Sequence, residues 1–223
     1  MRVLRNHGLA LFFLAIFLAA LVGQAFTGQD NFNHAQIAHG GDPITLWRYV
    51  KSSSYWTDVL ENWQSEYLQF TLYIFVTVWL VQKGSPESKK LDEIGRESDE
   101  QQRVGAHARD NSPRWARVGG LRTRIYSNSL VMVMLTIWIL CWLGQGVAGR
   151  IDYNAEQIDH RTAPVGFARY LTTSDFWNRT LQNWQSEFLA VGSMAVLSIY
   201  LRQRGSPESK PVGSPHSATG VEG

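Results

Sequence analysis

The chain has a single cysteine, Cys141, among its 223 residues. One thiol cannot close an intrachain disulfide, and without neighbouring His or Cys residues it does not form a metal site. Cys141 falls inside an apolar run, so we expect a small buried hydrophobic side chain. His39 and His160 stand one in each half, without cysteine and with variable acidic neighbours, so we expect solvated loop histidines and no bound metal.

The sequence also lacks a strong charge of either sign. It carries 21 Lys and Arg against 19 Asp and Glu, a net charge of +2. The basic residues are interleaved with acidic ones and lack aromatic partners, which argues against nucleic-acid binding. The sequence offers no nucleophile–base pair, phosphate-binding loop or metal-ligand spacing, so we expect no enzyme and no cofactor.

Long apolar runs, by contrast, are present. Residues 9–26 and 130–149 contain no charged residue, and shorter charge-free runs cover 67–82 and 188–201. About 18–20 apolar residues in a helix cross a hydrocarbon layer of roughly 30 Å. The pattern predicts an all-α protein, a four-helix transmembrane bundle in contact with the lipid bilayer.

The chain is internally duplicated. Shifted by 121 residues, the segment 9–89 aligns with 130–210 without a gap, and about 30 of roughly 80 pairs are identical. Each half therefore holds two predicted spans, and two spans return the chain to its starting side. We expect two parallel repeats in the same orientation, related by an axis along the membrane normal.

The N-terminus allows two interpretations. Arg2 and Arg5 followed by an apolar stretch resemble a signal peptide that would be cleaved near residue 26. The same stretch aligns with the internal segment 130–147, which favours a retained span. The repeat therefore supports retention, and cleavage remains the alternative.

The distribution of Lys and Arg predicts the orientation. The segment 83–126 carries ten of them, whereas the first loop, roughly 27–61, carries only Arg48 and Lys51. The positive-inside rule then places both termini and the middle segment in the cytoplasm and both long loops outside. We divide the chain into a first repeat (1–89), a charged, flexible cytoplasmic linker (90–126), a second repeat (127–210) and a disordered tail (211–223).

The hexapeptide "GSPESK" follows the second span of each half, at 84–89 and 205–210. Glycine ends a helix by taking a left-handed conformation, and Ser-Pro-Glu is typical of a helix start. The hexapeptide is therefore interpreted as a turn at the cytoplasmic surface, or as a docking site for a cytoplasmic partner.

The pentapeptide "NWQSE" precedes each second span, at 62–66 and 183–187. Ser53 or Ser54, and Ser174 or Asp175, are predicted to cap helices that run to Gln82 and Gln203. Such helices, about 42 Å long, exceed the hydrocarbon thickness and project beyond it. Four tryptophans are predicted to anchor the loops and helices at the interface: Trp56, Trp63, Trp177 and Trp184.

A polar cluster is predicted at the outer ends of the spans. Gly23 and Gly144 would let helices approach closely, so that the adjacent glutamines bond the carboxylates. The cluster contains Gln24, Asn62, Glu66, Gln145, Asn183 and Glu187. It either locks the helices together, binds a proton or cation between paired glutamates, or recognises a partner or lipid headgroup. A homo-oligomer or another membrane partner is compatible with the last reading.

With these motifs in place, the chain resembles a family of small bacterial multi-pass membrane proteins known only as a domain of unknown function. The resemblance rests on "GQ" late in the first span, "NWQSE" before the second and "GSPESK" after it, in both halves. It implies a bacterial inner-membrane location and supplies no activity, cofactor or catalytic residue. We therefore expect a non-enzymatic membrane protein, with a small channel or transporter as the alternative.

Overall fold

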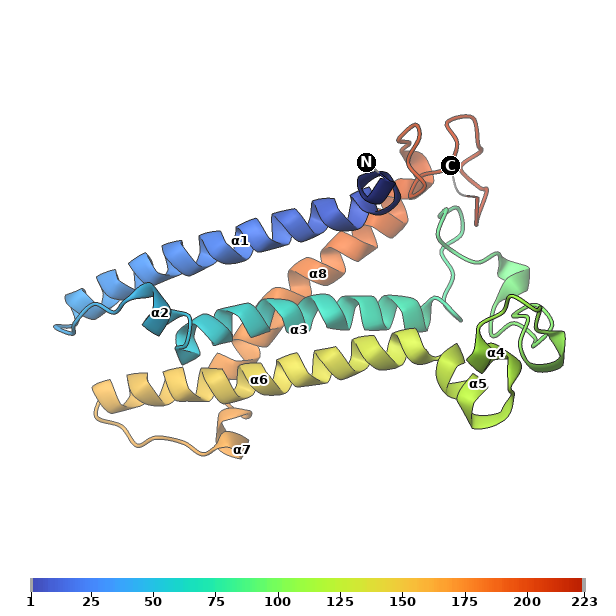
Figure 1. Ribbon diagram of the computed structural model, residues 1–223. Coiled ribbons are helices and arrows are strands. Elements are labelled where there is room, and N and C mark those ends of the chain that lie inside the picture. The colour runs from blue at the N-terminus through green and yellow to red at the C-terminus, as the bar shows by residue number, and fades with distance from the viewer. Residues whose placement is uncertain (1, 222–223) are drawn as a thin grey trace. The chain divides into compact units, whose positions relative to one another are not determined.

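The computed structural model describes residues 2–221, and within that range the chain is all-helical. Two long helices and one short helix form in each half, and further short helices lie between the halves (Figure 1). The first three are α1 (Arg2–Ala38), α2 (Leu46–Tyr49) and α3 (Ser53–Val76). The last three are α6 (Ser129–Asp159), α7 (Phe167–Tyr170) and α8 (Ser174–Tyr200). The short elements are η1 (Leu91–Glu93), η2 (Gly105–His107), α4 (Arg114–Arg117) and α5 (Gly120–Ser127).

Two of these helices are long and apolar enough to cross a membrane, α1 from Val3 and α6. Four apolar spans were predicted, and α3 and α8 are not among the helices that meet this test. Both carry charged residues within the helix, Asp58, Glu61 and Glu66 in α3 and Asp175, Arg179 and Glu187 in α8, and these residues lower the mean hydropathy of the helices.

The helix starts lie close to the predicted positions, but the capping side chains differ. α3 begins at Ser53 and α8 at Ser174, close to the predicted starts, but the predicted capping residues are wrong because the caps are Ser52 and Thr173. Ser52 Oγ accepts from the backbone N–H of Tyr55 at 3.3 Å, and Thr173 Oγ1 accepts from that of Phe176 at 3.3 Å. Each hydroxyl satisfies a backbone donor in the first turn that has no partner within the helix.

The predicted helix ends are wrong. α3 ends at Val76 and α8 at Tyr200, before Gln82 and Gln203. Long-range contacts use the carbonyls that a longer helix would need, because Gly95 N donates to Val78 O at 2.8 Å. In α8, Arg202 Nη1 donates to Ile199 O at 3.1 Å, which is a cation at a helix C-terminus.

The predicted outer loops are also shorter than expected. Helix α1 continues to Ala38 and α6 to Asp159, so the first loop, predicted to begin near residue 27, begins twelve residues later. Residues such as Ala35 and Gln36 favour helix although they are not part of the apolar run. Because of this helical propensity, α1 and α6 extend beyond the ends of their apolar runs.

Contacts divide the chain into two compact units that cut across the sequence halves. The first unit contains residues 1–60 and 144–176, and the second contains 61–143 and 177–223. The predicted division into two sequential repeats, a linker and a tail follows the sequence instead. The first unit contains the long loop of each half, and the second unit contains both NWQSE and both GSPESK motifs.

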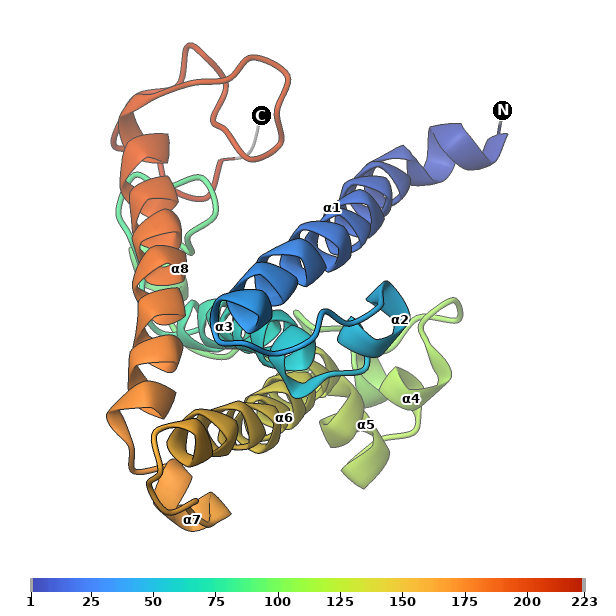
Figure 2. The same ribbon diagram turned by 90° about the vertical axis from the view of Figure 1, so that its left-hand side faces the viewer.

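The first unit contains two loops built in the same way. Asn33 exchanges two hydrogen bonds with the backbone of Ile44, at 3.0 and 2.7 Å. Asn154 does the same with Val165, at 3.0 and 2.8 Å. The short helices α2 and α7 follow Ile44 and Val165, and each lies in the connection between two long helices (Figure 2).

An aromatic group fills the inside of each loop. Tyr49 is 2% exposed and Tyr170 is 0% exposed. In the first loop Phe32, Tyr49 and Tyr55 have successive ring centroids 5.7 and 5.6 Å apart. In the second loop the corresponding distances are 5.5 and 5.6 Å, among Tyr153, Tyr170 and Phe176. Tilted and edge-to-face rings at these distances are the favoured geometry for aromatic pairs.

In the second unit, the segment predicted to be a flexible linker contains η1, η2, α4 and α5. Lys89 Nζ donates to Glu97 Oε1 at 2.5 Å and to the carbonyl of Gly95 at 2.7 Å, holding the start of the linker in a turn. Thr123 Oγ1 donates to Trp115 O at 2.6 Å, which joins α4 to α5. The hydrogen bond from Lys89 holds the pKa of Glu97 below its ordinary value.

Candidate functional site

The two NWQSE motifs lie on α3 and α8, both in the second unit. In each motif the serine bonds within its own helix. Ser65 Oγ donates to Asn62 O at 2.8 Å, and Ser186 Oγ donates to Asn183 O at 2.8 Å. Such bonds to a preceding carbonyl keep the hydroxyl within its helix.

The glutamine of the first motif contacts the tryptophan of the second. Gln64 is 0% exposed, and its Oε1 accepts from Trp184 Nε1 at 3.0 Å. The Nε2 of the same amide donates to Glu61 O at 3.0 Å. A buried amide with both ends bonded is stable, whereas one that loses a partner keeps the full cost of its desolvation. The motifs therefore bond to each other directly.

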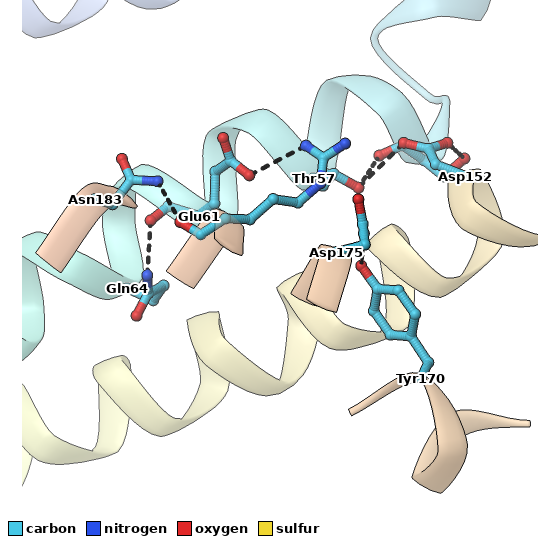
Figure 3. A network of polar contacts seen from close by, with 9 residues as sticks. Thr57, Glu61, Gln64, Asp152, Tyr170, Asp175 and Asn183 are labelled. Atoms are coloured by element: carbon cyan, nitrogen blue, oxygen red, sulfur yellow. Dashed lines mark hydrogen bonds and ion pairs between the residues drawn. The ribbon is translucent and has the colours of Figure 1, made fainter. Parts of the chain in front are cut away.

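An ion pair lies one helical turn before this contact. Arg179 Nη1 is 3.3 Å from Glu61 Oε2, and these side chains are 35% and 17% exposed. Asn183 Nδ2 donates to the carbonyl of Arg179 at 2.9 Å. Figure 3 shows the dashed contacts around Glu61, Gln64 and Asn183. Because the pair is partly shielded from water, removing one partner would leave an uncompensated charge.

The paired glutamates lie in the same unit. Glu66 is exposed and Glu187 half-buried, and the charge of Glu66 acts on Glu187. Asn62 is exposed and Asn183 half-buried. Four of the six residues predicted to form the polar cluster thus belong to the second unit.

The two predicted glutamine partners belong to the first unit. Gln24 is half-buried on α1, and Gln145 is fully buried on α6. Their neighbouring glycines differ: a Cβ at Gly144 would lie 2.9 Å from Leu60 Cδ1, whereas no described atom lies within 4 Å of a Cβ at Gly23. The close helix approach predicted at both glycines is therefore present at Gly144 alone of the two.

The four predicted tryptophan anchors fall into two classes. Trp56 is 41% exposed and Trp177 is 39% exposed, as an interfacial side chain requires. Trp63 and Trp184 are half-buried, and the indole of Trp184 is engaged by Gln64. Trp184 thus has a partner in the protein as well as its predicted position near the interface.

A second polar group lies in the first unit around Asp152. Its carboxylate accepts from Ser53 Oγ at 2.5 Å and from Thr57 Oγ1 at 3.3 Å. Burial raises the pKa of the nearby Tyr49, and the charges of Asp58 and then Asp152 raise it further. Figure 3 labels Thr57 and Asp152, and also Tyr170, whose hydroxyl donates to Asp175 Oδ2 at 2.8 Å. These contacts bond the start of α3 to α6 and the start of α8 to α7.

Both GSPESK segments form the same turn. Gly84 and Gly205 have φ values of +90° and +84°, the left-handed region that favours glycine. Ser88 Oγ accepts from Gln82 N at 2.8 Å, and Ser209 Oγ accepts from Gln203 N at 2.9 Å. The motif is therefore a turn, as predicted.

The lysine of the second turn holds the tail. Lys210 is 1% exposed, and burial, followed by the charge of Arg202, lowers its pKa. Its Nζ lies 2.6 Å from Gly84 O, which belongs to the first GSPESK turn. Three further carbonyls of the tail surround it, those of Pro215 at 3.3 Å, His216 at 3.0 Å and Ala218 at 3.1 Å. The segment expected to be disordered is thus bonded to both turns.

The comparisons with known proteins agree with these motifs. A family described as Domain of unknown function (DUF6766) matches residues 1–221. The chain belongs to this family. The match includes both NWQSE motifs and both GSPESK turns, and the predicted membership of an uncharacterised family is confirmed. No curated protein and no solved structure matches the chain.

Three residues that position the motifs of this DUF6766 chain were missed from the sequence: Glu61, Gln64 and Arg179. One signal was present, because Arg179 aligns with Asp58 under the 121-residue shift. A basic side chain in one half, Arg179, and acidic side chains at or near the aligned position in the other, Asp58 and Glu61, indicate an ion pair between the two halves. Gln64 carried no such signal, since Gln185 is identical to it and is exposed.

Proposed function

We propose that the protein is a multi-pass integral membrane protein with a non-enzymatic role in the membrane. The observation that carries this proposal is the exposure of its apolar helices. In the most apolar stretch of α1 6% of the residues are buried, and in that of α6 17%. A helix that is apolar all round and uncovered by protein requires an apolar surrounding, which a bilayer supplies.

The finer topology is part of the same proposal. Four spans, in two parallel repeats with both termini in the cytoplasm, account for the apolar runs and for the ten basic residues of 83–126. The matching element starts of the two halves support the repeat: α2 and α7 begin 121 positions apart, as do α3 and α8. A bacterial inner membrane follows from the family resemblance described above.

The NWQSE contacts support a structural role for the motifs. Gln64 bonds Trp184 and Glu61 pairs with Arg179, so the polar side chains are satisfied by one another. Interhelical hydrogen bonds of this kind stabilise membrane helix pairs by about 0.6–2 kcal/mol each. The motif thus holds α3 and α8 together. The surface of the protein that faces away from this contact is left to bind lipid, a second copy of the chain or another membrane protein.

A second function, passage of a proton or small cation, is favoured by one observation. Glu66 and Glu187 interact through their charges, and carboxylates at membrane depth are costly unless they are used. Substitution of Glu66 and Glu187 therefore distinguishes the structural role from ion passage.

The test combines membrane extraction with one double variant. Alkaline carbonate washing of membranes should leave the protein in the pellet, and the intact mass should show whether residues 1–26 are retained. Release into the supernatant would refute membrane integration. In proteoliposomes, the wild type and the Glu66→Gln, Glu187→Gln double variant should both show ion flux at the level of protein-free liposomes. A flux present in the wild type and lost in a folded variant would instead establish transport.

A further inference from the structure

The first loop contains a groove of about 600 Å³ that lies wholly in the first unit. Its apolar lining is formed by Phe32, Pro43 and Ile44. Its polar lining contains Gln36, Asp42, Arg48, Lys51 and Ser52. We call this the loop groove. Neither the NWQSE contacts nor the GSPESK turns involve it.

The walls of the loop groove are held in place before any ligand binds. Asn33 and Gln29 both bond Ile44 O, at 3.0 and 2.8 Å. Phe32 packs on the buried ring of Tyr49, and Thr45 Oγ1 accepts from the backbone of Arg48 at 3.4 Å. A site whose side chains stand on fixed backbone loses less entropy on binding than a mobile loop would.

The charge of the groove is positive and not neutralised locally. Within residues 2–221, neither Arg48 nor Lys51 makes an ion pair. Lys51 Nζ lies over the ring of Trp47, 4.0 Å from its centroid, and this contact leaves the ammonium able to bond an anion. With Asp42 on the same lining, the groove carries a net charge of +1. A phosphodiester, with its single negative charge, balances that charge, and a guanidinium binds it with two parallel hydrogen bonds.

The neighbouring Trp47 indicates where that phosphodiester comes from. Its side chain is 69% exposed on α2, beside the groove. Exposed tryptophan together with lysine is typical of protein at the level of lipid headgroups. We propose that the loop groove binds the headgroup of an anionic phospholipid, with Arg48 and Lys51 on the phosphate and Gln36 and Asp42 on the polar headgroup. This inference rests on the proposed membrane location.

The second loop serves as an internal comparison. It keeps the arginine, as Arg169, on the equivalent helix α7. Trp47 and Lys51 correspond to Ala168 and Thr172, and Asp42 corresponds to Ala163. The aromatic packing is the same in both loops, so the difference lies in the chemistry of the lining and not in the support beneath it.

The test is a titration of the full-length protein in detergent. Short-chain phosphatidylglycerol, below its micellar concentration, is compared with phosphatidylcholine of the same chain length, and retained lipid is measured by native mass spectrometry. We expect tighter binding of phosphatidylglycerol, weakened by added salt. Arg48→Gln with Lys51→Gln should reduce its affinity at least about tenfold, as expected for the loss of charged hydrogen bonds. Asp42→Asn should strengthen it about two- to threefold, because a like charge leaves the groove.

The matched control is Arg169→Gln, which removes the equivalent charge from the second loop and should leave affinity unchanged. Near-ultraviolet circular dichroism of the tyrosine-rich loops verifies that each variant is folded. Equal affinity of wild type and double variant, or equal binding of the two lipids, would overturn the proposal. Competition by free glycerophosphoglycerol at the lipid's own affinity would overturn the lipid source. Carbonate extraction reports separately on membrane integration, so each proposal fails on its own measurement.

Discussion

Two glutamines in identical motifs have opposite surroundings. Gln64 is 0% exposed and bonds Trp184 and the carbonyl of Glu61, whereas Gln185 is exposed. We predict that Gln64→Leu lowers the free energy of unfolding by about 1–3 kcal/mol, because the half-buried Trp184 indole N–H loses its acceptor. The measurement is denaturant unfolding of the purified protein in detergent, followed by tryptophan fluorescence.

Gln185→Leu is the matched control for that change. The side chain, the substitution and the motif are the same, and only burial differs. We expect this variant to unfold within about 0.5 kcal/mol of the wild type. Comparable losses in both variants would show that the glutamine acts through its own helix and not through Trp184.

The sequence identified the motifs but not which copy of each residue is used. The repetition of "NWQSE" correctly drew attention to residues 62–66 and 183–187. It also indicated the glutamates as the functional residues, because carboxylates are the costly groups near a membrane. The burial of Gln64 depends on how two helices pack in one unit, and identical pentapeptides contain no information about that packing.

At the scale of the helices, starts were predictable and ends were not. A cap is a local interaction, so the hydroxyl-bearing residues around 53 and 174 indicated the start of each helix to within one residue, although the capping side chains are Ser52 and Thr173. The end of α3 at Val76 involves Gly95, nearly twenty residues further along the chain. Only the folded structure reveals such a contact.

Helix α1 packs on its loop through a glycine. A Cβ at Gly28 would collide with the hydroxyl of Tyr49, and one at Gly149 with that of Tyr170. We predict that Gly28→Ala destabilises the protein by about 1–3 kcal/mol, the usual cost of overpacking a filled site. Adding Tyr49→Phe should recover part of the loss, because the colliding atom is removed. Thermal unfolding of the single and double variants measures both effects.

Gly23→Ala provides the comparison on the same helix. No described atom lies within 4 Å of a Cβ there, so alanine meets no obstacle. Its higher helix propensity should leave stability unchanged or raise it by up to about 1 kcal/mol. A loss equal to that of Gly28→Ala would attribute the effect to backbone flexibility and contradict the steric account.

At the scale of the whole chain, segments far apart in sequence are held by a few polar groups. Lys210 Nζ bonds Gly84 O at 2.6 Å, and the tail adds Gly220 N to Ser85 O at 3.1 Å. Thr219 Oγ1 accepts from Gly84 N at 2.8 Å. The composition predicted a disordered tail over 211–223, whereas its described part, residues 211–221, is bonded to a lysine that precedes it and to a turn more than a hundred residues earlier. Composition alone does not reveal such contacts.

We predict that Lys210→Met releases the tail without unfolding the helices. Methionine has similar length but cannot donate to the four carbonyls, which then lie buried without a charged donor. Hydrogen exchange at the amides of Gly84 and Gly220 should accelerate by about ten- to a hundredfold, corresponding to the loss of about 1.5–3 kcal/mol from charged hydrogen bonds. Exchange within α6, measured in the same mass-spectrometry experiment, should not change.

Lys89→Met is the control that distinguishes the effect of the first GSPESK lysine from that of the second. Lys89 occupies the same place in the first GSPESK segment but bonds Gly95 and Glu97, so its loss should accelerate exchange in residues 91–97 and leave the tail protected. Unchanged exchange at Gly220 in Lys210→Met would contradict the assignment. In that case the bonds from Gly220 N to Ser85 O and from Gly84 N to Thr219 Oγ1 would suffice to hold the tail without the ammonium.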